Sequence, residues 1–414
     1  MKRWIAGLVV GPSAMLAATL AGAEERKPLE DLLIEKGVIT KEEAESVQTR
    51  RFAKWVDQTT FSGDIRLRQD STWRDAPTES DRHRLRFRLR VGADLKVQDL
   101  MVGIRLASGT GEQFSTNQSF DNLSSQKGLW IDRAYLRWQG AGSKWLTLTG
   151  GKMPNPFWTV YSTDAMWDED VNPEGLAESV SVAFGGSGKV FVNLAQIVLD
   201  EDSAGSLSTD QWLFGQQVGV ALEPVKDTKA TVAVTYYNFT NIENNSLGQA
   251  ACNPGNTRVA TVPPTFCPGT TNPIVLLNDY NVLDVTGHFA FNAGALPVEV
   301  MGDYLVNTAN PKDALGQETD DAGYQVGFIV GKAAEAKTWE LAYFHKVLGT
   351  DATVADLADA DFGTGGTDRR GDIVWAAYNP TKYLQAKAKY VDTEKLSPGQ
   401  DDVKRLQADL VLKF

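Results

Sequence analysis

Four arginines stand at every second position of the stretch HRLRFRLRVG (residues 83–92). They are Arg84, Arg86, Arg88 and Arg90, and apolar residues fill the positions between them. A period of two is that of a β-strand, so the four guanidiniums share one face and the apolar side chains share the other. Guanidiniums are always charged and bind carboxylates or phosphates through paired hydrogen bonds. The chemistry that this face offers is therefore recognition of anions in water, whereas the opposite face needs an apolar medium.

Other stretches add basic residues to the same kind of face. In FSGDIRLRQ (61–69), Arg66 and Arg68 alternate with apolar residues, and the final stretch KRLQADLVLKF repeats this pattern. We name the whole set the basic wall, because we expect neighbouring strands to carry it. Its members are Arg66, Arg68, Arg84, Arg86, Arg88, Arg90, Arg105, Arg133, Arg137, Lys387, Lys389 and Arg405.

These faces need strands to hold them, and residues 59–414 supply the strands. Alternation of apolar and polar residues predicts about 16 segments, most of them near the length of a tilted membrane strand. The segments are 61–69, 84–96, 100–107, 129–140, 145–151, 179–185, 189–199, 211–222, 230–239, 281–292, 296–306, 322–331, 338–347, 370–378, 382–391 and 404–414. Short turns alternate with long loops, which are 70–83, 108–128, 152–178, 200–210, 240–280, 307–321, 348–369 and 392–403. This order is typical of an all-β, transmembrane, up-and-down antiparallel barrel, with short turns in the periplasm and long loops outside.

A membrane barrel explains both faces of residues 83–92. An arginine on the lipid face at the bilayer midplane costs about 2–4 kcal/mol. Four on one strand would cost on the order of 10 kcal/mol, which rivals the stability of a domain. The basic wall must therefore line a wet lumen, and barrel closure would extend it across the last two and the first four strands. In this assignment Asp132 falls on the outer face.

The N-terminal part differs in kind from the barrel. Residues 1–23 have a basic start, an apolar middle and a small-residue end, which is the pattern of a cleaved secretory signal peptide. Residues 24–58 are charged and helical in pattern, with Gly37 as a helix stop and Thr40 with Glu43 as a capping box. We expect a short periplasmic helical extension there, with a flexible linker as the alternative.

Composition limits the function. The chain has 414 residues and a net charge of −12, which argues against a nucleic-acid partner. It has three histidines and no Ser/His/Asp arrangement in a fitting context, so we expect no enzyme activity, no cofactor and no metal site. Cys252 and Cys267 are close in sequence in an exported chain, which indicates one disulfide that closes a long loop.

The chain ends on an alternating strand whose last residue is Phe414. Together with LEDLLIEKGVIT near the N-terminus and GGKMPNPF (150–157), this ending resembles the porins of the Gram-negative outer membrane, both general and anion porins. The resemblance implies a barrel of about 16 strands in outer-membrane lipid. It further implies a homotrimer that passes small hydrophilic solutes and ions by passive diffusion. It also implies that the barrel assembly machinery recognises the last strand through Phe414.

The resemblance places the long loop after the fifth strand, residues 152–178, inside the barrel, where it would narrow the channel. The loop acids expected to face the basic wall are Asp164, Asp168, Glu169, Asp170, Glu174 and, at the end of the loop, Glu178. Opposite charges across a narrow wet passage create a transverse field that orders water, excludes apolar solutes and tunes ion selectivity. In the alternative interpretation, residues 168–170 are a solvated charge run on the surface.

Three functions fit this pattern. The first is an outer-membrane porin for passive diffusion of small hydrophilic solutes. The second is an anion- or phosphate-selective porin, because guanidiniums bind oxyanions through paired hydrogen bonds. The third, of another class, is a structural or scaffold barrel, which would be wider or would lack an inward loop.

Overall fold

The computed structural model describes residues 33–41, 43, 58–76, 80–160, 164–201, 210–245, 247, 253–259 and 275–414. Contacts divide the chain into two units, Met1–Asp57 and Gln58–Phe414. The expected signal peptide (residues 1–23) and the expected disulfide between Cys252 and Cys267 lie outside the described residues. Within the described ranges, no helix is both long and apolar enough to cross a membrane.

The described part of the first unit contains the local helix signals. Gly37 has a φ of 65°, and the Val38 amide donates to the Leu33 carbonyl at 2.9 Å, which is how a glycine in the left-handed conformation ends a helix. The Glu43 carboxylate accepts a hydrogen bond from the Thr40 amide at 2.8 Å, and the Thr40 hydroxyl accepts one from the Glu43 amide at 3.1 Å. This reciprocal pair is a capping box.

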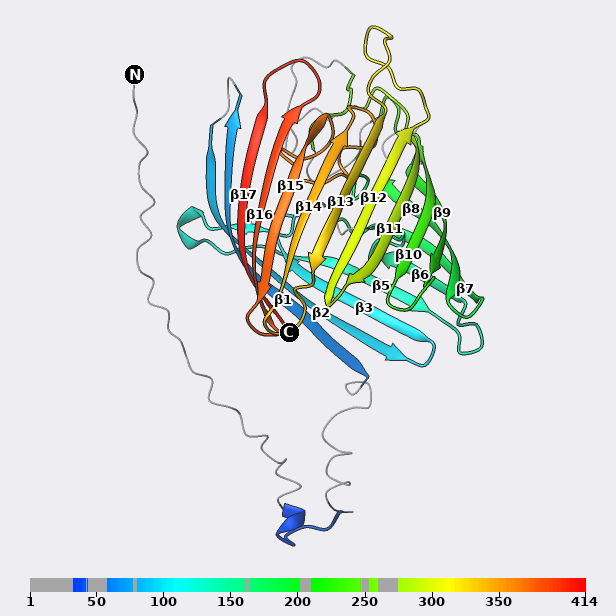
Figure 1. The fold of residues 1–414 in the computed structure, drawn as a ribbon, viewed down its shortest axis with the longest axis vertical. Coiled ribbons are helices and arrows are strands. Elements are labelled where there is room, and N and C mark those ends of the chain that lie inside the picture. The colour runs from blue at the N-terminus through cyan, green and yellow to red at the C-terminus, as the bar shows by residue number, and fades with distance from the viewer. Residues whose placement is uncertain are drawn as a thin grey trace. The chain divides into compact units, whose positions relative to one another are not determined.

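The second unit is a closed antiparallel barrel (Figure 1). Its strands are β1 (Thr59–Asp75), β2 (Arg82–Val97), β3 (Leu100–Ser108), β4 (Gln118–Ser119), β5 (Leu129–Trp138), β6 (Leu146–Lys152), β7 (Glu174–Phe184), β8 (Gly188–Asp200), β9 (Gln211–Leu222), β10 (Lys229–Thr240), β11 (Asn281–Ala293), β12 (Leu296–Asn307), β13 (Ala322–Gly331), β14 (Thr338–Leu348), β15 (Arg369–Asn379), β16 (Leu384–Lys395) and β17 (Asp402–Lys413). Because β4 is a two-residue pairing on β2 within a long loop, β3 pairs directly with β5 and 16 strands form the wall. β1 pairs with both β2 and β17, which closes the sheet. The fold class predicted from the alternation is confirmed.

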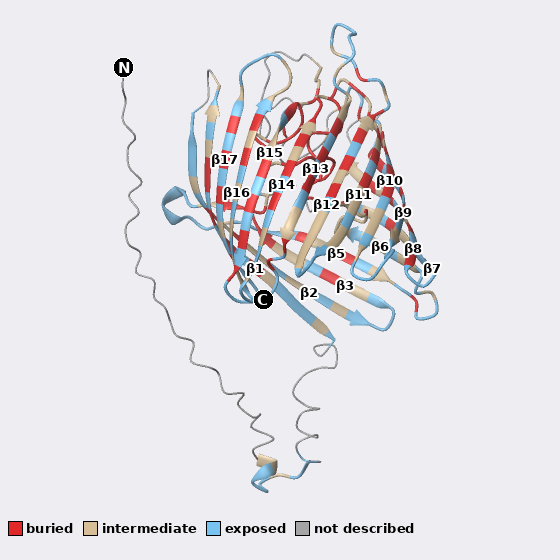
Figure 2. Cartoon of the chain, viewed as in Figure 1, coloured by how far each residue is buried: buried red, intermediate tan, exposed pale blue. Residues whose placement is uncertain are grey.

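Side chains alternate between the lumen and the outer surface along the strands. In β1, Arg66 and Arg68 are each 6% exposed, whereas Ile65 and Leu67 are 42% and 49% exposed. Buried and exposed bands alternate in the same way along the strands in Figure 2. The exposed apolar band suits lipid, and the closed ladder leaves no strand edge unpaired within it.

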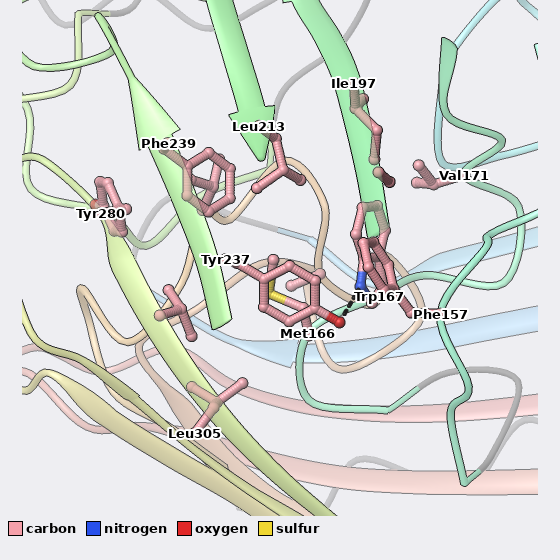
Figure 3. Close-up of a cluster of buried hydrophobic side chains, with 14 of the residues drawn as sticks. Phe157, Met166, Trp167, Val171, Ile197, Leu213, Tyr237, Phe239, Tyr280 and Leu305 are labelled. Carbon is pink, nitrogen blue, oxygen red and sulfur yellow. Dashed lines mark hydrogen bonds between the residues drawn. The ribbon is translucent and has the colours of Figure 1, made fainter. Parts of the chain in front are cut away.

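The loop between β6 and β7, which the structure describes at residues 153–160 and 164–173, lies inside the barrel because it carries its own apolar side chains. Phe157 and Trp167 are buried against the inner face of the strands, and the Trp167 indole N–H donates to the Tyr237 hydroxyl at 3.1 Å (Figure 3). A glycine on β9 makes room for this packing, since a Cβ at Gly215 would lie 2.1 Å from the Phe157 ring. The inward segment is shorter than the expected range of 152–178, because β7 already begins at residue 174.

A second long loop also lies inside the barrel, which corrects the expectation of an outer loop. Residues 349–368 join β14 to β15, and Ala352 and Phe362 in this loop are 0% exposed. The buried Asp351 carboxylate accepts hydrogen bonds from the Tyr280 hydroxyl at 2.7 Å and from the Thr257 hydroxyl at 2.6 Å. The apolar residues of this loop follow neither a strand nor a helix period, so sequence alternation gave no sign of their burial.

Candidate functional site

Six adjacent strands carry the basic wall on the lumen side of the barrel. They are β16, β17, β1, β2, β3 and β5, which pair in that order. On β1 and β2, Arg66 stands opposite Arg88 and Arg68 stands opposite Arg86, and the four residues are 5–9% exposed. Arg405 on β17 is 6% exposed. These arginines therefore share one inner surface, as their common parity requires.

Carboxylates on the same strands neutralise much of this wall. Asp64 and Asp70 have the same parity as Arg66 on β1, which extends to Asp75, whereas the sequence pattern had assigned residue 70 to the following loop. Because each carboxylate pairs with guanidiniums beside it, the field across the lumen is weaker than the number of arginines alone suggests. The contacts are Asp70 with Arg84 (2.6 Å) and Arg405 (2.9 Å), Asp64 with Arg88 (2.9 Å) and Arg90 (2.7 Å), Asp409 with Arg68 (2.7 Å), and Asp70 with Arg86 (3.4 Å).

The second inward loop adds a further carboxylate to the wall. Asp361 accepts a hydrogen bond from Arg68 Nη1 at 3.0 Å and lies 2.9 Å from Arg405 Nη2. Burial raises the pKa of this carboxyl, but Arg405, Arg68 and Lys389 lower it by more, so its pKa lies well below the usual range. Asp361 is therefore ionised and ties residues 349–368 to the wall. No periodic signal in the sequence marks it.

Two of the predicted loop acids face the basic wall. Asp170 lies 3.6 Å from Arg90 Nη1. The Glu169 carboxylate lies 4.0 Å from Arg88 Nη1, and its side chain is 43% exposed. Partial burial raises the pKa of Glu169, but Arg88, Arg66 and Arg90 lower it by more, so its net pKa is lowered. These two carboxylates supply negative charge across from the arginines.

Asp168 instead joins the two inward loops. Its carboxylate accepts hydrogen bonds from the Ala360 and Asp170 amides, both at 2.8 Å, and its own amide donates to the Leu357 carbonyl at 2.7 Å. Burial and the nearby carboxylates of Asp170 and Asp359 raise its pKa well above the usual range. Asp168 and Asp170 are 7% and 6% exposed, so a solvated charge run on the surface does not describe this segment.

The remaining predicted loop acids do not face the wall. Asp164 accepts a hydrogen bond from the Trp167 amide at 2.7 Å and so caps a tight turn within the loop. Glu174 lies 2.8 Å from the Lys152 ammonium, where β6 ends and β7 begins. Glu178 belongs to β7 rather than to the loop. Local turn geometry and strand ends, which the composition of the loop does not reveal, determine these positions.

Asp132 faces the lumen, which corrects its expected outer position. The pairing of β3 with β5 shifts after Arg105, and Asp132 is the extra residue of this β-bulge. It is 8% exposed, its carboxylate pairs with Arg105, and it accepts a hydrogen bond from Asn172 at 2.9 Å. Asn172 also accepts one from Arg133 Nε at 2.7 Å. A bulge reverses the parity of one strand end, which strict alternation cannot foresee.

Four members of the basic wall form no ion pair with a carboxylate in the described part of the chain, and one of them, Arg133, donates to the Asn172 side chain instead. The Arg137 guanidinium lies 5.3 Å from the ring centroid of Tyr135. The Lys387 ammonium lies 4.4 Å from the ring centroid of Trp375, a cation–π contact. Lys389 lines a cavity together with Lys387. The lysines of β16 therefore leave positive charge in the lumen that no direct ion pair balances.

A cavity of about 240 Å³ lies between the inward loops and the wall, and we name it the constriction cavity. A larger cavity of about 1000 Å³ shares Ser115 and Asp170 with it and is lined by the ends of β5 and β8. Among the residues that the structure describes, no group of three or more histidines, cysteines or acids could hold a metal ion. The cations that line the constriction cavity are Arg66, Arg68, Arg88, Arg90, Lys387, Lys389 and Lys413.

The last residue lies at the seam of the barrel. The Phe414 amide donates to the Gly63 carbonyl at 3.0 Å, and the Gly63 amide donates to the Phe414 carbonyl at 2.9 Å. The Phe414 ring lies over this glycine, because a Cβ at Gly63 would be 2.6 Å from it. The final residue thus completes the ladder between the first and last strands.

Comparisons with known proteins place the chain among membrane channels. A family model described as "Putative porin" matches residues 73–272 and 255–414. OprB of Pseudomonas putida, in its high-pH structure, superposes with a TM-score of 0.55 at 13% identity over 89% of this chain and 97% of that one. OmpF of Salmonella typhi, in a complex with daunomycin, gives a TM-score of 0.51 at 10% identity over 87% and 99% of the two chains. At these identities the structures indicate a common fold only. No curated protein matches the sequence.

Proposed function

Because the chain belongs to this porin family and forms a closed outer-membrane barrel, we propose that it is a water-filled channel through which small hydrophilic solutes and ions diffuse passively. A barrel of this size can enclose an aqueous passage, and here two inward loops narrow it. The resulting activity is transport rather than catalysis.

One observation carries this proposal, namely the opposed charges around the constriction cavity. Glu169 and Asp170 lie on the loop side, and Arg88 and Arg90 lie on the wall side, within 3.6–4.0 Å of the acids. A solute in this cavity is exposed to the field of these charges in a confined space where water is scarce. Polar and charged solutes gain from such a field, and apolar solutes must displace ordered water without compensation.

Conductance in a planar lipid bilayer tests the proposal. The purified, folded barrel should produce discrete conductance steps in potassium chloride. Reversal potentials under a salt gradient then measure ion selectivity. Folded protein that inserts into the bilayer without conductance steps would rule out a channel.

Anion selectivity is the second candidate function, and the lysines of β16 favour it. Lys387 and Lys389 line the constriction cavity without an ion pair in the described residues, so the cavity keeps positive charge beyond what its carboxylates balance. A reversal potential close to that of chloride would support this candidate. A potential close to that of potassium would exclude it.

The scaffold alternative has less support. A sheath around a partner would need an open lumen, whereas residues 153–160, 164–173 and 349–368 fold into this one. Phe157, Trp167 and Phe362, which are 0–5% exposed, help to fill it.

We further propose that residues 1–23 are removed on export and that the mature chain assembles as a homotrimer in outer-membrane lipid. The seam position of Phe414 supports a role for the last strand in recognition by the barrel assembly machinery. N-terminal sequencing of the mature protein should give Glu24 as the first residue, and native mass spectrometry in detergent should give three copies. An uncleaved chain or a stable monomer would contradict the respective proposal.

A further inference from the structure

We propose that the constriction cavity contains a binding subsite for the carboxylate of a small organic anion, and that the Glu169 carboxylate occupies the position of that group when no solute is bound. This inference rests on the proposed channel function and names the chemical class of solute that the channel retains at its narrow point. It also assigns a competing role to one residue of the inward loop.

Two buried guanidiniums supply free donors to this subsite. Arg66 Nε and Arg88 Nη1 are buried and have no hydrogen-bond partner in the described structure. The two residues stand directly opposite each other on β1 and β2, so their side chains are neighbours on the inner face. A buried donor without an acceptor is costly, and the cost is larger for a charged group. An acceptor from a solute would remove that cost.

Arg66 Nη2 and two nitrogens of Arg88 already have partners, which hold the two guanidiniums in place. Arg66 Nη2 donates to Asn117 Oδ1 at 2.7 Å, and Arg88 Nε donates to Asp64 Oδ1 at 2.9 Å. Arg66 Nη1 lies 4.0 Å from Asp409, beyond hydrogen-bond distance. The subsite is therefore preorganised, because its donors need not reorient when an anion arrives.

Glu169 is close to one of these donors, Arg88 Nη1, without being bonded to it. Its carboxylate is 4.0 Å from Arg88 Nη1, which is too long for a hydrogen bond, and no hydrogen bond to its side chain occurs among the described residues. The positive charges of Arg88, Arg66, Arg90 and Lys387 all act on it. Glu169 is thus a carboxylate that is surrounded by positive charge but lies too far from Arg88 Nη1 to accept its hydrogen bond, as expected for a group that a better acceptor can displace.

The neighbours of Glu169 keep the backbone in place, so that its side chain can move while the loop stays. Asp168 accepts hydrogen bonds from the Ala360 amide, and Asp170 accepts one from the Thr116 amide at 3.2 Å. Both side chains are buried, whereas that of Glu169 is 43% exposed to the lumen. Displacing the Glu169 side chain therefore breaks no loop contact of its neighbours.

The size and charge of the cavity define the solute. Its volume of about 240 Å³ corresponds to roughly eight water molecules in the liquid. Arg66 and Arg88 are cross-strand neighbours that each offer one unpaired N–H group, and Lys387 and Lys389 add positive charge to the lining of the cavity. A short aliphatic carboxylate satisfies these limits.

Block of the open channel by butyrate tests the inference, with butyramide as the uncharged probe of the same shape. Butyrate should interrupt the single-channel current of the wild-type protein in a concentration-dependent way, and butyramide should not. Glu169→Gln should lower the half-blocking concentration about 1.5- to 5-fold, the range expected when one partly exposed charge is removed. Lys389→Gln should raise it by a similar factor.

Matched variants control for general charge effects. Glu174→Gln changes an acid that is paired with Lys152 away from the wall, and Lys404→Gln changes a lysine whose side chain is 57% exposed on β17. Neither should alter the block. Equal block by butyrate and butyramide, or an unchanged half-blocking concentration in Glu169→Gln, would overturn the subsite.

A calorimetric measurement separates this inference from the channel proposal. If the wild-type barrel does not conduct, the channel function fails, but titration of butyrate into the folded protein in detergent still decides on the subsite. Binding that strengthens in Glu169→Gln supports it, and absence of binding in both proteins refutes it. Inorganic phosphate as a third probe distinguishes a carboxylate site from a general oxyanion site, because binding of phosphate at least as tight as that of butyrate would overturn the assignment to carboxylates.

Discussion

Replacing Trp167 by alanine should release the first inward loop from the wall. Trp167 is 2% exposed, its ring stacks on Phe157 with centroids 6.2 Å apart, and its indole N–H donates to the Tyr237 hydroxyl at 3.1 Å. The substitution removes a large buried side chain from a packed cluster, and changes of this kind cost about 3–5 kcal/mol. The barrel wall does not depend on this contact, since its strands are held by their own ladders.

The lost free energy therefore changes only the equilibrium between the packed and the released loop. A loss of about 4 kcal/mol changes that equilibrium by nearly a thousandfold. Because Asp168 and Asp170 still anchor residues 153–173, we expect the released form to become measurable rather than dominant. Each release widens the constriction, so larger and noisier conductance levels should appear beside the wild-type level.

Single-channel recording and limited proteolysis of the folded protein measure the two consequences. The variant should show added conductance levels and faster cleavage within residues 153–173. Trp145→Ala is the matched control, because this tryptophan is 51% exposed and lies in the short turn before β6. If Trp167→Ala keeps the wild-type conductance and protease resistance, the packing of Figure 3 does not hold the loop and the reasoning fails.

Three further changes probe other parts of the site. Gly215→Ala places a Cβ 2.1 Å from the Phe157 ring, and this overpacking should destabilise the packed loop by about 1–3 kcal/mol and so lower its unfolding midpoint. Gly287→Ala is the control, because a Cβ there meets nothing within 4 Å and should leave the midpoint unchanged; equal midpoints in the two variants would contradict the close contact. The raised pKa of Asp168 means that the packed loop binds a proton on this carboxyl more tightly than the released loop does. The stability that this proton gives to the packed loop is therefore fully present below the ordinary pKa of aspartate and is lost as the pH rises through the raised pKa. Proteolysis of the loop should therefore accelerate from pH 4 to pH 8 in the wild type and less so in Asp168→Asn, and an equal pH dependence in both would refute this. Replacing Arg86 and Arg88 by alanine frees wall carboxylates and should move the reversal potential in a potassium chloride gradient toward that of potassium; an unchanged potential would argue against a role of this wall in selectivity.

Alternation in the sequence predicted the 16 strands of the wall, although β7 begins at residue 174 rather than at 179. The expected segment 84–96 corresponds to β2 at Arg82–Val97, and Arg86 and Arg88 lie on the inner face as their parity requires. The reason is local: successive side chains of a strand point to opposite sides, and a membrane allows charge on only one of them.

The path of the long loops could be predicted from the sequence only in part. Resemblance to porins suggested one inward loop, but its acids are distributed by contacts that composition does not encode, so that only Glu169 and Asp170 face the wall. Nothing in residues 349–368 indicated that they too fill the lumen, because their burial depends on partners such as Tyr280 that are distant in sequence.

The sequence by itself therefore determined a barrel with a charged, wet interior, since that follows from side-chain periodicity and from the cost of placing charge in lipid. Only the tertiary structure decided how the charges combine. The bulge at Asp132 turns a carboxylate inward, the seam brings Asp409 beside Arg68, and the second loop delivers Asp361 to the same cluster. These pairs join residues far apart in the chain, and the energy of a charge depends on its distance to others in space, which no local pattern contains.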